Sequence, residues 1–201
     1  MKNKIPQLLI IFRLLLGPTM ICLTYKFKEI IRFELVILII LGLLSDIFDG
    51  IIARKTGVSS EKLRRMDSQT DLVFWICVGI CAWLLNPEII LSNKISILIV
   101  FVMEALTYAF SFAKFRKETC THAILSKLWG ITLLASFISM IGFGYAGIPF
   151  FLAIFFGIIG HLDVYLIIYF LPKWTHDVPS CYHAYLIKKG IVIKLNSLFN
   201  G

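Results

Sequence analysis

Long apolar stretches alternate with short polar connections along the whole chain. A helix needs about 20 mostly apolar residues to cross the hydrocarbon core of a bilayer. Six stretches meet this requirement, at 7–25, 33–53, 64–85, 95–113, 123–143 and 148–171. No repeat, low-complexity tract or linker separates them into groups. The pattern therefore predicts an all-α integral membrane bundle of six transmembrane helices, with residues 1–201 forming a single domain.

The composition agrees with this interpretation. Hydrophobic residues make up 59% of the chain and charged residues 16%, whereas a soluble domain averages roughly 45–50% apolar and about 25% charged residues. The mean hydropathy is +0.87. The formal charge of +8 comes from basic residues placed between the apolar stretches rather than in one block. Membrane lipids are therefore expected as partners, and nucleic acid is not.

The basic residues also predict an orientation. Most of the 20 lysines and arginines lie near the two termini, in the connection after the second stretch and in the connection after the fourth. Cytoplasmic connections are enriched in lysine and arginine. We therefore expect both termini to be cytoplasmic. The exception is the first outer connection, which carries Lys26, Lys28 and Arg32.

Four aspartates interrupt the second and third apolar stretches. Asp46 and Asp49 are three residues apart, and Asp67 and Asp71 are four apart, so each pair lies on one helix face. Ionisable groups within membrane spans cost roughly 2.5–3.5 kcal/mol each on insertion scales, and they mark functional sites by default. A short connection predicts that the two helices are antiparallel neighbours. The four carboxylates would then meet in one pocket about 10 Å from the cytoplasmic helix ends.

Clustered carboxylates repel one another unless cations neutralise them. All-oxygen ligand sets suit Mg²⁺ or Mn²⁺, and two such ions close together are a known arrangement for phosphoryl chemistry. The pocket thus predicts two divalent ions and a diphosphate-bearing lipid as substrate. The structural alternative is that the carboxylates pair with the arginines near the helix ends, Arg54, Arg64 and Arg65.

The spacing of these residues resembles a family signature. The string Asp46-x-x-Asp49-Gly50-x-x-Ala53-Arg54, followed after eight residues by Leu63-x-x-x-Asp67-x-x-x-Asp71, is similar to that of the CDP-alcohol phosphatidyltransferases. That signature reads D-x-x-D-G-x-x-A-R-x8-G-x3-D-x3-D. The one departure is Leu63, where the family has a glycine. The start of the chain, Ile5-Pro6 followed by an arginine-containing span and Pro18, also looks like this family.

The resemblance implies a role for each matching residue. Asp46, Asp49 and Asp67 would be metal ligands, and Asp71 would be both a ligand and the general base. The implied contacts to the nucleotide and diphosphate are Gly50, Ala53, Arg54 and Ser60. A glycine at position 50 leaves room for a flat base, and an arginine offers forked donors to phosphate oxygens. The implied location is a bacterial cytoplasmic membrane with the site facing the cytoplasmic leaflet, and a homodimer would fit the family.

The implied reaction moves a phosphatidyl group from CDP-diacylglycerol to an alcohol and releases CMP. Glycerol 3-phosphate is the favoured acceptor; another polyol phosphate, inositol, serine and a second lipid are alternatives. In the basic connection after the fourth stretch, Arg116 and Lys127 are the candidates for holding an acceptor phosphate. The alternative for that connection is a topology signal that binds no ligand.

Two other functions also fit clustered intramembrane carboxylates. One is an ion-coupled membrane transporter, and the other is a membrane phosphatase that uses water as the nucleophile on the same metals. Two further carboxylates, Glu104 and Asp163, lie within spans but belong to no motif. We expect them to pair with Arg13 or with each other, and we expect His161 to be a hydrogen-bonded core residue.

Overall fold

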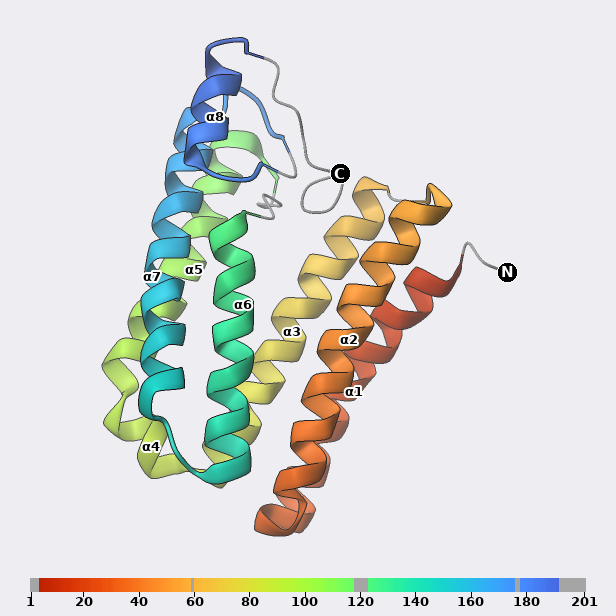
Figure 1. The fold of residues 1–201 in the computed structure, drawn as a ribbon, viewed down its shortest axis with the longest axis vertical. Coiled ribbons are helices and arrows are strands. Elements are labelled where there is room, and N and C mark those ends of the chain that lie inside the picture. The colour runs from red at the N-terminus through yellow and green to blue at the C-terminus, as the bar shows by residue number, and fades with distance from the viewer. Residues whose placement is uncertain (1–3, 59, 118–122, 176–177, 192–201) are drawn as a thin grey trace. The chain divides into compact units, whose positions relative to one another are not determined.

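The computed structural model describes residues 4–58, 60–117, 123–175 and 178–191, and it is helical throughout these ranges apart from short connections (Figure 1). The all-α prediction is confirmed. Each of the six apolar stretches coincides with a helix. In chain order the elements are α1 (Ile5–Phe27), η2 (Lys28–Ile31), α2 (Arg32–Thr56), α3 (Glu61–Leu85), α4 (Pro87–Ser92), α5 (Lys94–Phe115), α6 (Ile124–Phe137), the π-helix η3 (Ile138–Gly142), α7 (Gly147–Phe170) and α8 (Cys181–Lys188).

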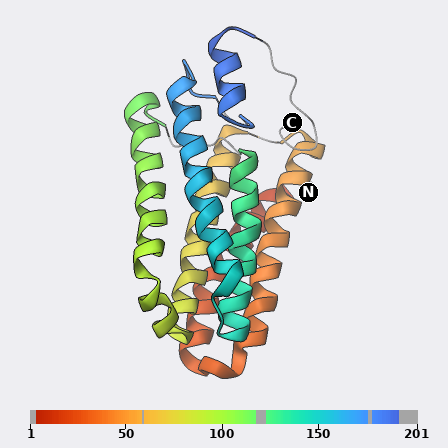
Figure 2. The same cartoon turned by 60° about the vertical axis from the view of Figure 1, so that its left-hand side comes forward.

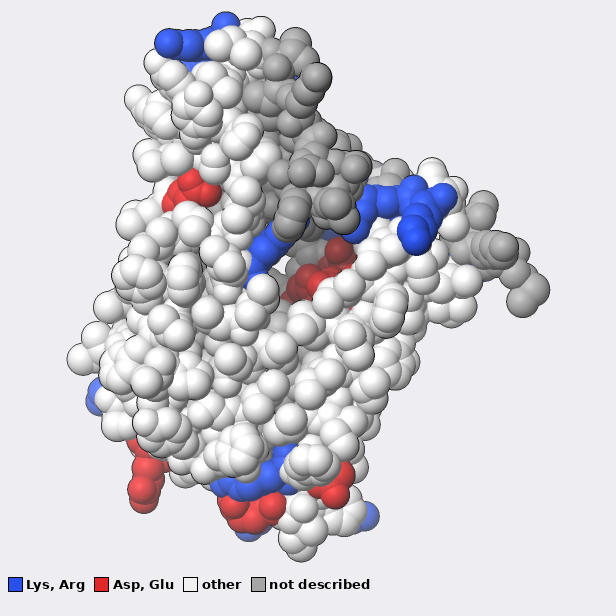
Figure 3. Space-filling view, viewed as in Figure 1, with Lys and Arg blue, Asp and Glu red and all other residues white. Residues whose placement is uncertain are grey.

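Five helical stretches within the described residues are long and apolar enough to cross a membrane, as expected of an integral membrane protein. The first of them runs from Ile5 to Thr56 and contains both α1 and α2. These two helices pack against each other, so the chain turns back at η2 instead of continuing as one straight helix. The space-filling view shows few charged side chains along the helix flanks (Figure 3). The six-span count and the common side of the termini stay predictions.

Packing divides the chain into two compact units, and each is described by itself. Unit 1 comprises Met1–Ser92 and Ser136–Ala146, and unit 2 comprises Asn93–Ala135 and Gly147–Gly201. Figure 2 shows the same helices in a turned view. The prediction of a single domain stays open, and every contact described below lies within one unit.

In unit 1, α1 packs against both α2 and α3. The sequence predicts α2 and α3 as direct neighbours, but each contacts α1 more extensively than it contacts the other. Small residues allow the close approach. A Cβ atom on Gly17 of α1 would lie 2.9 Å from Cys77 Sγ of α3, and one on Gly42 of α2 would lie 2.3 Å from Cζ of the buried Phe74.

At the η2 end of unit 1, the guanidinium of Arg32 joins three segments. Its Nη1 donates to the Ile141 carbonyl of η3 at 2.7 Å, its Nη2 donates to Asn86 Oδ1 at 3.0 Å, and its Nε pairs with Glu29. Asn86 Nδ2 in turn donates to the Met140 carbonyl at 2.8 Å. Because the Arg32 guanidinium forms hydrogen bonds and an ion pair within the protein, this residue stabilises the fold at the η2 end. This accounts in part for the basic residues that did not fit the orientation rule.

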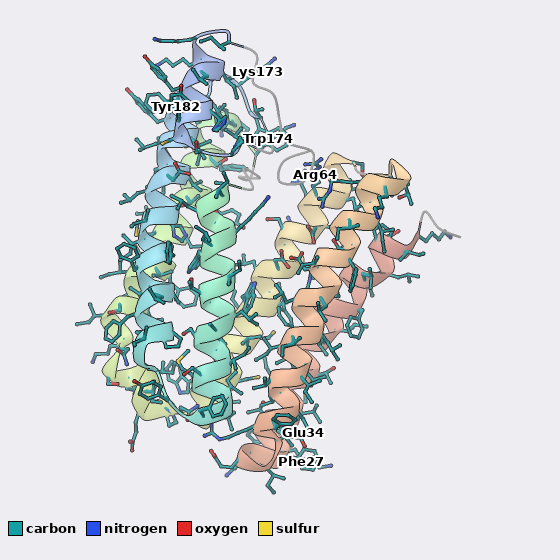
Figure 4. All side chains as sticks on the ribbon, viewed as in Figure 1. Phe27, Glu34, Arg64, Lys173, Trp174 and Tyr182 are labelled. Carbon is teal, nitrogen blue, oxygen red and sulfur yellow. The ribbon has the colours of Figure 1, made fainter. Side chains whose placement is uncertain are left out.

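Unit 2 is held by contacts at the end of α7. Lys114 Nζ of α5 donates to the carbonyls of Ile168 and Tyr169, both at 2.8 Å, where the negative end of the α7 dipole favours a cation. Beyond α7, Lys117 Nζ lies 4.5 Å from the ring centre of Trp174. Figure 4 labels Trp174 in the segment between α7 and α8.

Replacing Gly42 with alanine should destabilise unit 1. The added Cβ would clash with Phe74, and overpacking of a core typically costs about 1–3 kcal/mol. We expect Gly42→Ala to lower the melting temperature of the detergent-solubilised protein by several degrees. Gly79→Ala is the matched control, because its Cβ would meet only Phe137 Cζ at an ordinary 4.0 Å. An equal loss in both variants would contradict the close α2–α3 contact.

Candidate active site

Four carboxylates from two helices converge on one buried guanidinium in unit 1. Nη1 of Arg13 lies 2.5 Å from Asp46 Oδ1 and 3.1 Å from Asp71 Oδ1. Nη2 lies 3.3 Å from Asp49 Oδ2 and also pairs with Asp67 Oδ1. The Arg13 side chain is only 1% exposed. The expected meeting of the four carboxylates is therefore observed, with a cation from α1 at its centre.

Helical spacing explains this convergence. Asp46 and Asp49 lie on the face of α2 that meets α1, and Asp67 and Asp71 lie on the corresponding face of α3. The four side chains differ in exposure: Asp49 is 4% exposed, Asp67 20%, Asp46 32% and Asp71 34%. Asp46 and Asp71 are therefore the most accessible to a substrate.

The donor set fits a divalent cation. Asp46, Asp49 and Asp67 each offer a carboxylate oxygen within 4.8 Å of the others. Asp49 Oδ2 is buried and, besides its ion pair with Arg13, accepts no hydrogen bond from any described residue. A single guanidinium also leaves most of the charge of four carboxylates uncompensated. Oxygen ligands of this kind suit hard cations such as Mg²⁺ and Mn²⁺.

The residues that follow Asp49 along α2 form the C-terminal end of this helix. The guanidinium of Arg54 folds back over Gly50, so that a Cβ there would lie 3.3 Å from Arg54 Nη1. Ala53 is buried, and Arg54 is exposed. The helix ends at Thr56, and Gly57 follows in the left-handed conformation with φ 68°. The absence of a side chain at position 50 therefore lets the Arg54 guanidinium lie against the helix.

Ser60 and Leu63 form the N-terminal cap of α3. Ser60 is the N-cap, and its Oγ accepts a hydrogen bond from the Leu63 backbone N–H at 3.2 Å. Such a cap typically contributes about 1 kcal/mol. Leu63 is half-buried. The cap gives Ser60 a structural use beside its implied contact to the diphosphate, which stays a prediction.

The two candidate acceptor residues lie in unit 2. Arg116 follows α5 in the left-handed conformation, with φ 56°, and Lys127 is in the first turn of α6. Both side chains are exposed. The segment 118–122 between the two helices lies outside the described residues. A role for either residue in binding an acceptor stays a prediction.

The expected pairing of Glu104 and Asp163 with Arg13 or with each other is wrong. Glu104 Oε2 lies 2.6 Å from Nε2 of His161, which is buried and hydrogen-bonded as expected. Asp163 Oδ1 accepts the Cys181 backbone N–H at 2.9 Å and so fixes the start of α8. Burial, helped by the Asp163 carboxylate, raises the pKa of the Cys181 thiol. These two carboxylates therefore stabilise contacts between the helices of unit 2.

Arg13 is the residue whose role the sequence did not reveal. The structural alternative placed Arg54, Arg64 and Arg65 opposite the carboxylates, whereas the partner common to all four is Arg13. A usable signal was present: α1 contains no acidic residue that could pair with this arginine. A lone cation in one span and four anions in two others are complementary, but nothing in the spacing specifies which face of α1 meets them.

Comparison with known proteins identifies a matching family. A family model described as CDP-alcohol phosphatidyltransferase matches residues 3–170. This range includes all the residues of the carboxylate motif as well as Arg13. No curated protein and no solved structure matches the chain.

Proposed function

Because this chain belongs to the CDP-alcohol phosphatidyltransferase family, we propose that it transfers the phosphatidyl group of CDP-diacylglycerol to glycerol 3-phosphate and releases CMP. The general reaction of this family is the transfer of a phosphatidyl group from a CDP-lipid to an alcohol, and the family uses divalent metal ions. The proposal adds the diacylglycerol donor, the acceptor, the number of ions and the role of each residue.

The observation that supports the site most directly is the imbalance of charge around Arg13. Four carboxylates face one guanidinium, which is buried. Asp46, Asp49, Asp67 and Asp71 would hold two Mg²⁺ or Mn²⁺ ions, whose remaining positions suit a substrate diphosphate. When bound, such ions withdraw charge from phosphorus and stabilise a phosphate leaving group.

Asp71 would act as the general base. It is the most exposed of the four carboxylates, at 34%, so an acceptor hydroxyl could approach it. Asp71 would take the proton of that hydroxyl as its oxygen bonds to the phosphatidyl phosphorus. The bond from this phosphorus to the bridging diphosphate oxygen would then break, with CMP as the leaving group. Asp49, at 4% exposed, would hold ions rather than move protons.

The cytoplasmic end of α2 would bind the nucleotide. Gly50 gives a flat surface, Ala53 keeps the helix face small, and Arg54 is held over Gly50, where its forked donors could reach diphosphate oxygens. Ser60, the exposed N-cap of α3, would add a hydroxyl contact. Leu63 in place of the family's glycine would narrow the space for cytidine and marks a divergent member.

The acceptor would carry a phosphate. Arg116 and Lys127 are exposed cations at the two sides of the α5–α6 connection, and such residues bind phosphate oxygens through charge-assisted hydrogen bonds. This charge favours glycerol 3-phosphate over an uncharged acceptor such as inositol. A second copy of the chain as a homodimer partner would fit the family.

The proposed setting is a bacterial cytoplasmic membrane. The division of Ile5–Thr56 into α1 and α2 at η2 supports six spans instead of five. An even number of spans would place both termini in the cytoplasm, in agreement with the basic connections. The carboxylates would then lie within the inner leaflet, where a CDP-lipid headgroup and a water-soluble acceptor can both reach them.

A CMP-release assay with a panel of acceptors tests the proposed reaction. The purified protein should release CMP from CDP-diacylglycerol only with Mg²⁺ or Mn²⁺ and only when an acceptor is added, and glycerol 3-phosphate should be the best acceptor. Lipid products are identified by mass. Arg116→Ala and Lys127→Ala should each raise the KM for glycerol 3-phosphate about tenfold while leaving that for the CDP-lipid unchanged. Release of CMP without any alcohol would indicate a phosphatase instead.

Asp71→Asn should abolish most turnover without unfolding the protein. An amide keeps the shape of the side chain but cannot accept the hydroxyl proton, and loss of a general base typically costs about 10²–10⁴ in rate. The measurement is kcat for CMP release, with thermal unfolding as the test of folding. Glu88→Gln, which changes an exposed carboxylate on α4, is the control. Near-normal kcat in Asp71→Asn would refute the assignment.

Gly50→Ala should weaken binding of the CDP-lipid. The added Cβ would lie 3.3 Å from Arg54 Nη1, which is close enough to push the guanidinium aside. Loss of one hydrogen bond to a charged group corresponds to about tenfold or more in binding. We expect KM for CDP-diacylglycerol to rise by about that factor, with a normal melting temperature. Gly130→Ala, whose Cβ would meet nothing within 4 Å, should leave KM unchanged.

A further inference from the structure

Each terminal nitrogen of Arg13 bridges the two helices that carry the carboxylates. Nη1 contacts Asp46 of α2 and Asp71 of α3, and Nη2 contacts Asp49 of α2 and Asp67 of α3. Arg13 Nε and Nη1 are both buried without a hydrogen-bond partner among the described residues, but Nη1, unlike Nε, has ion pairs. The guanidinium is thus held through its ion pairs with α2 and α3.

We propose that Arg13 is an internal counter-ion: it holds the four carboxylates together when no metal is bound, and it competes with divalent cations for them. The identity of the ions rests on the proposed function. The role of Arg13 as a positioning residue is not part of that function, because Arg13 lies outside the carboxylate motif and on a different helix.

The first half of this proposal follows from burial. Asp49 is 4% exposed and the Arg13 side chain 1%, so these charges receive little help from water. Leaving a buried charge without its partner is strongly destabilising. In the metal-free protein, the repulsion between the carboxylates of α2 and α3 would separate these helices if Arg13 were absent. Arg13 therefore keeps the site assembled before metal arrives.

The second half follows from shared ligands. Asp46, Asp49 and Asp67, whose oxygens lie within 4.8 Å of one another, are the group able to hold a cation, and Arg13 contacts every one of them. A metal ion bound there would lie close to the guanidinium. Two cations at such a distance in a partly buried site repel strongly. Metal binding must therefore overcome or displace Arg13, and this weakens the apparent affinity.

Removing the charge of Arg13 should consequently change two properties in opposite directions. The metal-free protein should become less stable, and the affinity for metal should increase. A residue that serves only as a structural support would lower both. A residue that binds only the substrate diphosphate would change neither in the absence of the CDP-lipid.

The test compares the wild type with Arg13→Gln in detergent, without any lipid substrate. Thermal unfolding is followed in EDTA and across a Mn²⁺ titration, and free Mn²⁺ is measured by electron paramagnetic resonance. In EDTA, Arg13→Gln should melt on the order of 10 °C lower than the wild type. Its Kd for Mn²⁺ should be at least about tenfold lower, so that saturating Mn²⁺ restores most of the lost stability.

Two further variants separate this outcome from general damage. Arg32→Gln removes the other networked arginine of unit 1, which contacts η3 and Asn86 rather than the carboxylates. It should lower the melting temperature equally in EDTA and in Mn²⁺ and leave the Mn²⁺ affinity unchanged. Arg13→Lys keeps the positive charge but loses the forked donors, so in EDTA it should melt between the wild type and Arg13→Gln, and it should bind Mn²⁺ more weakly than Arg13→Gln.

An unchanged or weaker Mn²⁺ affinity in Arg13→Gln overturns the proposal, as does Mn²⁺ binding by Arg13→Lys that is as tight as that by Arg13→Gln. Absence of Mn²⁺ binding in both the wild type and Arg13→Gln also overturns it. The proposed reaction is judged separately by CMP release from the wild type. If Arg13→Gln is less stable in EDTA and binds Mn²⁺ more tightly, but the wild type releases no CMP, the proposed function is contradicted and the role of Arg13 is supported.

Discussion

The ion pairs between Arg13 and the four aspartates are the interaction on which the rest of unit 1 depends. Breaking a buried ion pair by removing one partner typically costs about 3–5 kcal/mol, a large part of the stability of an ordinary domain. The small residues at Gly17 and Gly42 and the packing of α1 against both α2 and α3 let the charged groups come within contact distance. The polar centre is therefore built into the helix packing and is not an addition to an apolar bundle.

The sequence predicted the helices well because the physical signal is strong. A stretch of about 20 apolar residues has few stable states other than a membrane helix, and all six stretches coincide with helices. The spacing of the aspartates likewise placed each pair on one face. The position of α1 was not predictable in this way: its apolar residues surround the helix almost evenly, so no stripe marks the face that meets α2 and α3. Arg13 was visible, but its partners were not.

The predictions for Glu104, Asp163 and Arg32 were wrong or incomplete for a related reason: a charged residue in the sequence does not indicate which residue it pairs with. Glu104 pairs with His161, and Asp163 accepts a hydrogen bond from the start of α8; both partners lie far along the chain and belong to no motif. Arg32 appeared to contradict the orientation rule because the rule counts charge and not hydrogen bonds. In the structure this residue bonds to carbonyls of the π-helix η3, where irregular helical geometry leaves such groups available.

The turn at η2 has a consequence for how the protein enters the bilayer during synthesis. Helix α1 carries Arg13 with no acidic residue of its own, and α2 carries Asp46 and Asp49. Each helix alone would bring unpaired charge into lipid. Because a short turn joins them, the two can leave the translocation machinery as one hairpin in which Arg13 already pairs with Asp46 and Asp49. We therefore expect α1 and α2 to partition into the membrane together, and α3 to join them by pairing Asp67 and Asp71 with the same guanidinium.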